Sequence, residues 1–211
     1  MLKDLIMSPQ IPGLNNLAKQ VFEANKAKGF WALNRSSAEI LVLILSEMFE
    51  ALEAERKSKS ALNLQACLDL IGDDRFKVFF VENIKDSFED ELADTVIRIL
   101  DMAGAWEIEL ETIYLAPTLQ SWSDQNISLG LMQREFFSFQ SCVLEFSFII
   151  NQIIQKELQT TIPEIELAKG ANQMLYFVLA VAKHYRVKVW DHVKIKLAYN
   201  ATRAHKHGKK Y

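Results

Sequence analysis

The stretch Ser46-Glu47-Met48-Phe49-Glu50-Ala51-Leu52-Glu53 lies inside Ala38–Lys57, a run whose periodicity predicts one long helix. Glu47 and Glu50 each follow an apolar residue by one heptad, so both carboxylates fall in register with an apolar stripe. Carboxylates on an apolar face are unfavourable unless they pair, bind a cation or take up a proton. The pattern therefore indicates either a cation site or a wide helix whose polar edge crosses the stripe.

A second run, Phe88–Ala105, follows Ser87 as a helix N-cap and is apolar around most of its circumference. Five of its polar residues fall within a sector of roughly 120°, namely Glu91, Asp94, Thr95, Arg98 and Asp101. A surface helix shows the reverse, a broad polar face and a narrower apolar one. We therefore predict a buried helix whose polar strip lines an internal cleft, in preference to a solvated face.

The composition favours long helices, because half of the residues are hydrophobic and only seven Gly and four Pro interrupt the chain. We predict an all-α protein with a capping box at Ser36 and Glu39. Further helices are expected at Leu14–Lys28, Ala61–Ile71, Glu107–Tyr114, Leu131–Leu158, from Thr161 to about Tyr185, and at His192–Arg203 with Asp191 as cap. Phe76–Ile84 is a helix or a packed connector, and Thr118–Gly130 is a loop.

The charge and the apolar runs exclude several classes of protein. A net charge of −3 gives no electrostatic case for binding nucleic acid or an anionic membrane. The longest apolar run, Met174–Ala182, is too short to span a bilayer. Met1–Gln10 lacks the apolar core of a signal peptide. A cytoplasmic location is the expectation.

The two acidic helices together offer four carboxylates, Glu47, Glu50, Glu91 and Asp94, as an ExxE and an ExxD pair. Side chains three residues apart point from the same face of a helix, so two packed helices can present all four to a hard cation. Oxygen ligands suit Mg²⁺ or Mn²⁺, and this chemistry suits metal-assisted hydrolysis at phosphorus. The di-iron carboxylate proteins are the rival, but no His here follows a Glu or Asp by three residues.

Four motifs in this order resemble the MazG-like nucleoside triphosphate pyrophosphohydrolases, which belong to an all-α superfamily. They are Gly29-Phe30-Trp31, the stretch from Ser46 to Glu53, the stretch from Glu91 to Asp101, and Lys196-Leu197-Ala198-Tyr199-Asn200-Ala201-Thr202-Arg203 with the basic tail that follows. The resemblance implies a helical bundle with a four-helix catalytic core. It also implies one domain over residues 1–211, with residues 107–189 as an additional helical insertion.

The resemblance further implies hydrolysis of an NTP or dNTP to the monophosphate and pyrophosphate, in a homodimer or higher homo-oligomer. The four carboxylates would bind Mg²⁺ and carry out catalysis. Lys196, Asn200 and Arg203 would contact phosphates or sugar, Arg98 and Asp101 are further candidates on the same strip, and Trp31 or Phe30 would face the base. No residue pattern indicates a particular base.

The sequence departs from the family in two places. Many members have a second Glu where Ser46 stands, so the site is expected to hold fewer metals or to hold one more loosely. The separation between Asp94 and Lys196 also exceeds that of a minimal domain, so Leu131–Tyr185 is interpreted as an added helical pair. This pair completes the bundle, covers the site or forms an oligomer interface. The alternative function is a non-catalytic helical interaction or nucleotide-binding module that retains a degenerate site.

Overall fold

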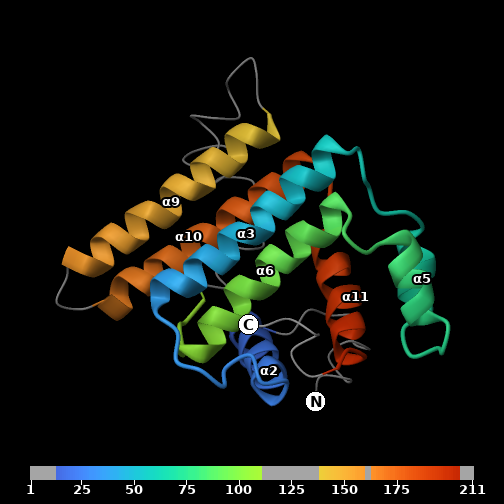
Figure 1. Ribbon diagram of the computed structural model, residues 1–211, viewed down its shortest axis with the longest axis horizontal. Helices are drawn as coiled ribbons and strands as arrows, with labels where there is room; N and C mark the ends of the chain where they lie inside the picture. The colour runs from blue at the N-terminus through green and yellow to red at the C-terminus, as the bar shows by residue number, and fades with distance from the viewer. Residues whose placement is uncertain (1–12, 111–137, 160–162, 205–211) are drawn as a thin grey trace.

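The computed structural model describes residues 13–110, 138–159 and 163–204 (Figure 1). These residues form eight helices and no strand, which confirms the all-α prediction. No helix in these ranges combines the length and apolar character needed to cross a bilayer. The helices are α2 (Leu14–Ala27), α3 (Ser37–Arg56), α4 (Leu64–Asp69), α5 (Phe76–Asn83), α6 (Phe88–Ala105), α9 (Phe139–Gln159), α10 (Pro163–His184) and α11 (Val189–Ala201).

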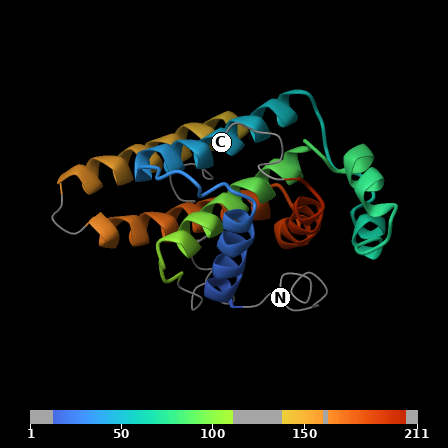
Figure 2. The same cartoon turned by 60° about the horizontal axis from the view of Figure 1, so that its bottom comes forward.

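Helix α6 lies at the centre of the molecule and packs against α2, α3, α10 and α11 (Figures 1 and 2). Its apolar residues cover almost every side, and several have no exposed surface, among them Leu92, Val96 and Leu100. A helix that is apolar nearly all round buries itself within protein. The sequence-based expectation of a buried helix at this position is therefore met.

Helices α9 and α10 pack against each other, and also against α3 and α6 respectively. The axes of the four long helices α3, α6, α9 and α10 are roughly aligned in both views (Figures 1 and 2). The interior of this group includes Phe146 and Phe177, whose ring centroids lie 5.7 Å apart. Helices α9 and α10 therefore form part of one helical bundle with α3 and α6.

The helix N-termini follow the expected capping chemistry at two sites. At Ser36, the hydroxyl accepts a hydrogen bond from the Glu39 backbone amide, and the Glu39 carboxylate accepts one from the Ser36 backbone amide at 2.8 Å. This is the predicted capping box. Ser87 accepts a hydrogen bond from the backbone amide of Asp90 at 3.2 Å. These caps fix the starts of the two acidic helices, and with them the positions of the acids one to four turns later.

Three predicted boundaries are wrong. Asp191 does not cap the last helix, because α11 begins at Val189 with Lys188 at the N-cap, and Asp191 lies in the first turn. The helix expected from Ala61 begins only at Leu64, because Asn63 before it has a left-handed backbone (φ 54°). No helix continues through residues 107–110, because Glu107 has φ 52°. The rest of that predicted segment, the loop at Thr118–Gly130, residues 131–137 and the basic tail lie outside the described residues.

Gly104 permits the close packing of α2 on α6. A Cβ atom at this position would overlap the backbone carbonyl of Ala18 and lie 2.8 Å from the Cβ of Phe22. We expect Gly104→Ala to lower the free energy of unfolding by about 1–3 kcal/mol, as overpacked cores do. The control is Gly13→Ala, whose Cβ would have no heavy atom within 4 Å. Urea denaturation measures both, and an equal loss in the two variants would contradict close α2–α6 packing.

His192 on α11 is buried, and its Nδ1 atom has no hydrogen-bond partner. Burial lowers its pKa from 6.5 to about 4. The unfolded chain therefore takes up a proton that the folded protein resists, so stability from this group is present above pH 6.5 and is lost as the pH falls toward 4. We expect a loss of roughly 3 kcal/mol between pH 7 and pH 4 from this residue. Urea denaturation across this range should show that His192→Gln removes most of that slope relative to the wild type.

Candidate functional site

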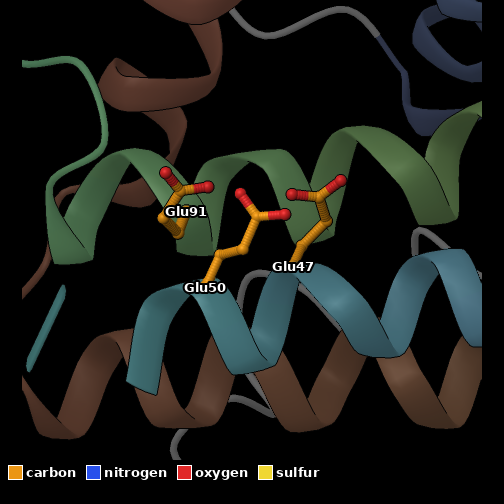
Figure 3. Close-up of side chains that lie close together, drawn as sticks. All are labelled: Glu47, Glu50 and Glu91. Carbon is orange, nitrogen blue, oxygen red and sulfur yellow. The ribbon is translucent and has the colours of Figure 1, made fainter. Parts of the chain in front are cut away.

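Three carboxylates meet in the space between α3 and α6 (Figure 3). Glu47 and Glu50 extend from α3 and Glu91 extends toward them from α6. Each residue offers one oxygen atom, and these oxygens all lie within 4.8 Å of one another. Glu47 and Glu91 are buried, whereas Glu50 is exposed, so the cluster opens to solvent on the Glu50 side.

Burial and the neighbouring carboxylates oppose the ionisation of Glu47 and Glu91. Burial, with the nearby Asp94 carboxylate adding to it, raises the pKa of Glu91 to about 9. Burial and Asp94 likewise raise the pKa of Glu47, although Arg98 opposes the rise. Arg98 Nε donates a hydrogen bond to Glu47 Oε1 at 2.7 Å. Three convergent carboxylates with one guanidinium form an oxygen-rich site that fits a hard divalent cation such as Mg²⁺ or Mn²⁺.

Asp94, expected as the fourth ligand, lies outside this set of converging oxygens. Its Oδ2 atom is 2.7 Å from Lys196 Nζ, and the same Nζ atom donates to Asp90 Oδ2 at 2.7 Å. Burial lowers the pKa of Lys196, but the carboxylates of Asp94, Asp90 and Glu91 outweigh this effect and raise the pKa overall. Lys196, expected at the phosphates, is thus a buried cation that holds two aspartates.

Asp90 also belongs to this site, although the sequence analysis did not predict it. Its side chain has no exposed surface, and burial raises its pKa to about 6 despite the nearby Lys196. Its Oδ1 atom has no hydrogen-bond partner. The available signal was helical phase, because Asp90 lies close in angle to Asp94 and Asp101 on the same helix. The sequence alone does not show that Lys196 on α11 contacts Asp90.

A pocket adjoins the carboxylate cluster and contains most of the other predicted residues. Its lining comes from the end of α2 and the segment after it, from α3 and α6, and from the end of α11. Predicted residues in the lining are Phe30, Trp31, Glu47, Asp94, Arg98, Asp101, Asn200 and Arg203. Arg35 and Asn25 also line it, whereas Glu50, Glu91 and Lys196 lie outside the lining.

Hydrogen bonds between distant parts of the chain hold several lining residues of this pocket in place. Trp31 Nε1 donates to Asp101 Oδ1 at 3.1 Å, which fixes the indole against α6. Lys28 Nζ donates to the backbone carbonyls of Asn200 and, at 2.8 Å, Arg203. This ammonium group caps the C-terminus of α11, where a positive charge is favourable.

The arrangement places the cluster of Glu47, Glu50 and Glu91 next to a cavity with both basic and aromatic walls. Arg35, Arg98 and Arg203 supply positive charge in the lining, and Asn200 has a buried Oδ1 atom without a hydrogen-bond partner. Guanidinium groups bind phosphates through paired hydrogen bonds, and Mg²⁺ held by few carboxylates completes its shell with water and phosphate oxygens. The chemistry supports a phosphorylated ligand with an aromatic part. Comparison of the chain with protein-family models, curated proteins and solved structures found no match.

Proposed function

We propose that this protein is a Mg²⁺-dependent nucleoside triphosphate pyrophosphohydrolase of the MazG-like kind. The observation that supports this most is the convergence of Glu47, Glu50 and Glu91 within 4.8 Å of one another, beside a pocket that contains Arg98 and Arg203. The resemblance of the four sequence motifs points to the same activity. A role in cleansing the nucleotide pool, in the cytoplasm where these substrates are abundant, is part of this proposal.

The reaction takes one water per nucleotide. Water oxygen bonds to the α-phosphorus, the bond between that phosphorus and the bridging oxygen to the β-phosphate breaks, and pyrophosphate leaves with the electron pair. The products are the nucleoside monophosphate, pyrophosphate and one proton. Glu47, Glu50 and Glu91 would hold Mg²⁺ (or Mn²⁺), which supplies Lewis acidity at the phosphate oxygens when bound. Arg203 and Asn200 would orient the phosphates or the sugar from α11.

Lys196 serves this proposed site by holding Asp94 and Asp90, since its Nζ lies 2.7 Å from an oxygen of each. This pairing keeps Asp94 near the cluster and reduces the negative charge that the phosphates would meet. Arg98 lies between the cluster and the pocket and is paired with Glu47. Both cations are partly or wholly buried, so their positions are set before a ligand arrives.

The test is a panel of NTPs and dNTPs assayed for pyrophosphate in the presence of Mg²⁺ or Mn²⁺. We expect release from at least one nucleotide, complete loss after the metal is removed with a chelator, and recovery when Mg²⁺ is added back. Turnover that persists in the chelator would contradict the assigned metal site. Absence of turnover with every nucleotide would contradict the activity.

A second candidate is a non-catalytic nucleotide-binding or interaction module. One observation favours it, namely that Asp94, expected to bind the metal, and Lys196, expected to contact the substrate, form an ion pair with each other. Calorimetry with Mg²⁺ and α,β-methylene nucleotides separates the two functions. Binding together with turnover of the natural nucleotides supports the enzyme, whereas binding without any turnover supports the module.

We also propose a homodimer or higher homo-oligomer, as the resemblance implies. Exposed apolar residues are consistent with such an assembly, including Val42 and Phe49 on α3 and Leu144 and Phe148 on α9. Light scattering coupled to size-exclusion chromatography tests this point. We expect a mass of at least twice the 24.2 kDa of one chain, and a monomeric mass at micromolar concentration would contradict it.

A further inference from the structure

Asp101 lines the same pocket and lies well beyond Glu91 along α6. It follows Glu91 by ten residues on α6, a separation of about 15 Å along a helix axis. The side chains of Asp94 and Arg98 line the pocket between these two points. Such a span suits an extended nucleotide with its phosphates at the cluster and its base beside Asp101.

The walls beside Asp101 suit a flat, aromatic ligand. Trp31, Phe30, Ile40, Leu43 and Ile97 contribute apolar surface to the same pocket. Apolar walls with a few fixed polar groups are typical of sites that bind small molecules. The polar groups of this pocket include the Asp101 carboxyl, which is 9% exposed.

The hydrogen bonds of Asp101 decide what it can offer to a ligand. Its Oδ1 atom accepts from Trp31 Nε1 at 3.1 Å, and the Asn25 side chain is a further hydrogen-bonding neighbour. An ionised carboxylate has about four acceptor positions and no donor, so acceptor capacity remains. An exocyclic amine on a base can donate to it, whereas a keto oxygen in the same place would meet another acceptor.

We infer that Asp101 is a specificity-determining residue that selects nucleotides whose base carries an exocyclic amine over those with a keto group at that position. The inference rests on the proposed function, because it assigns the base end of the same substrate. A carboxylate that accepts from the N4 amine of cytosine is an established form of base recognition. A site built around such a bond discriminates strongly, because the wrong base leaves buried polar groups unpaired.

Asp101 could instead only position Trp31 without contacting the base, and this alternative predicts a different result. Asp101→Asn retains an acceptor oxygen for the Trp31 indole and replaces the other oxygen with an amide NH₂ donor. If Asp101 only positions Trp31, this substitution changes the kinetics for all bases equally. If Asp101 contacts the base, the ratio between amine-bearing and keto-bearing nucleotides changes.

The experiment compares CTP with UTP and ATP with ITP, two pairs that differ by an amine and a keto group. Assays at pH 8 keep Asp101 ionised, because burial raises its pKa to about 7. We expect kcat/KM to favour CTP over UTP, or ATP over ITP, on the order of 10-fold to 100-fold. In Asp101→Asn the preference should disappear or reverse. The exposed Asp69→Asn on α4 is the matched control and should retain it.

Calorimetry with the α,β-methylene analogues of the same four nucleotides measures the selectivity of binding in the absence of turnover. Binding or hydrolysis with equal ratios, or a ratio unchanged in Asp101→Asn, would overturn the inference and leave the proposed function intact. Failure of every nucleotide to bind or react would overturn both. If Asp101→Asn does not fold, the wild-type ratios still decide, because a preference for UTP or ITP contradicts the role of Asp101.

Discussion

Replacing Glu50 with glutamine is expected to lower the rate of pyrophosphate release roughly 1,000-fold, since a metal's Lewis acidity contributes several kcal/mol to such transition states. Glu50 is one of three residues whose carboxylate oxygens converge within 4.8 Å. Glutamine keeps the shape of the side chain but removes its negative charge, so affinity for a hard cation should fall. Because Glu50 is exposed, the fold should not depend on it.

The matched control is Glu53→Gln, which lies one turn further along α3 and is paired with Arg56 and Lys57 at the surface. Its activity and thermal unfolding should equal those of the wild type, because surface ion pairs contribute little. Calorimetric titration with Mn²⁺ should show weakened binding in Glu50→Gln only. Equal activity in the two variants would remove Glu50 from the proposed metal site.

The largest expected effect on stability belongs to Lys196→Met. Its side chain is 6% exposed, and its Nζ atom lies 2.7 Å from Oδ2 of Asp90, whose side chain is fully buried. Removing one partner of a buried ion pair leaves the other charge uncompensated, which typically destabilises a protein by about 3–5 kcal/mol. We expect a loss of this size in urea denaturation at pH 7. Asp94 should contribute less to the loss, because 22% of its side chain is exposed to solvent.

A double substitution distinguishes loss of the pair from loss of packing. Asp90→Asn combined with Lys196→Met removes both charges and should recover most of the stability lost in Lys196→Met alone. The comparison variant is Lys194→Met, on the same helix but only partly buried. If the double variant is as unstable as Lys196→Met, the loss comes from packing around the lysine stem, and the buried pair is not its cause.

Much of the fold follows from periodicity and capping. Helix α6 is apolar on nearly every side, and it lies at the centre of the helices that surround it. The capping box at Ser36 and the N-cap at Ser87 can be predicted from the sequence because each depends on residues three positions apart. The same local rules placed Glu47, Glu50 and Glu91 on facing sides of their helices, where the structure finds them.

Helical phase alone does not identify the partners of a side chain. It places Asp94 and Lys196 on inward faces, but their mutual contact depends on how α11 packs against α6. Asn25 and Arg35 line the pocket only because segments remote in the sequence meet there. The non-helical residues after Trp106 depend on the left-handed backbone of Glu107, for which an acidic residue gives no warning.

The identity of the phosphorus products tests the central claim most directly. We propose to incubate the protein with Mg²⁺ and a nucleotide that it turns over, and to follow the reaction by phosphorus NMR. Cleavage between the α and β phosphates should give the nucleoside monophosphate and pyrophosphate in equal amounts, and none with the chelator present. Formation of the diphosphate and orthophosphate, or no product from any NTP or dNTP, would contradict the assignment.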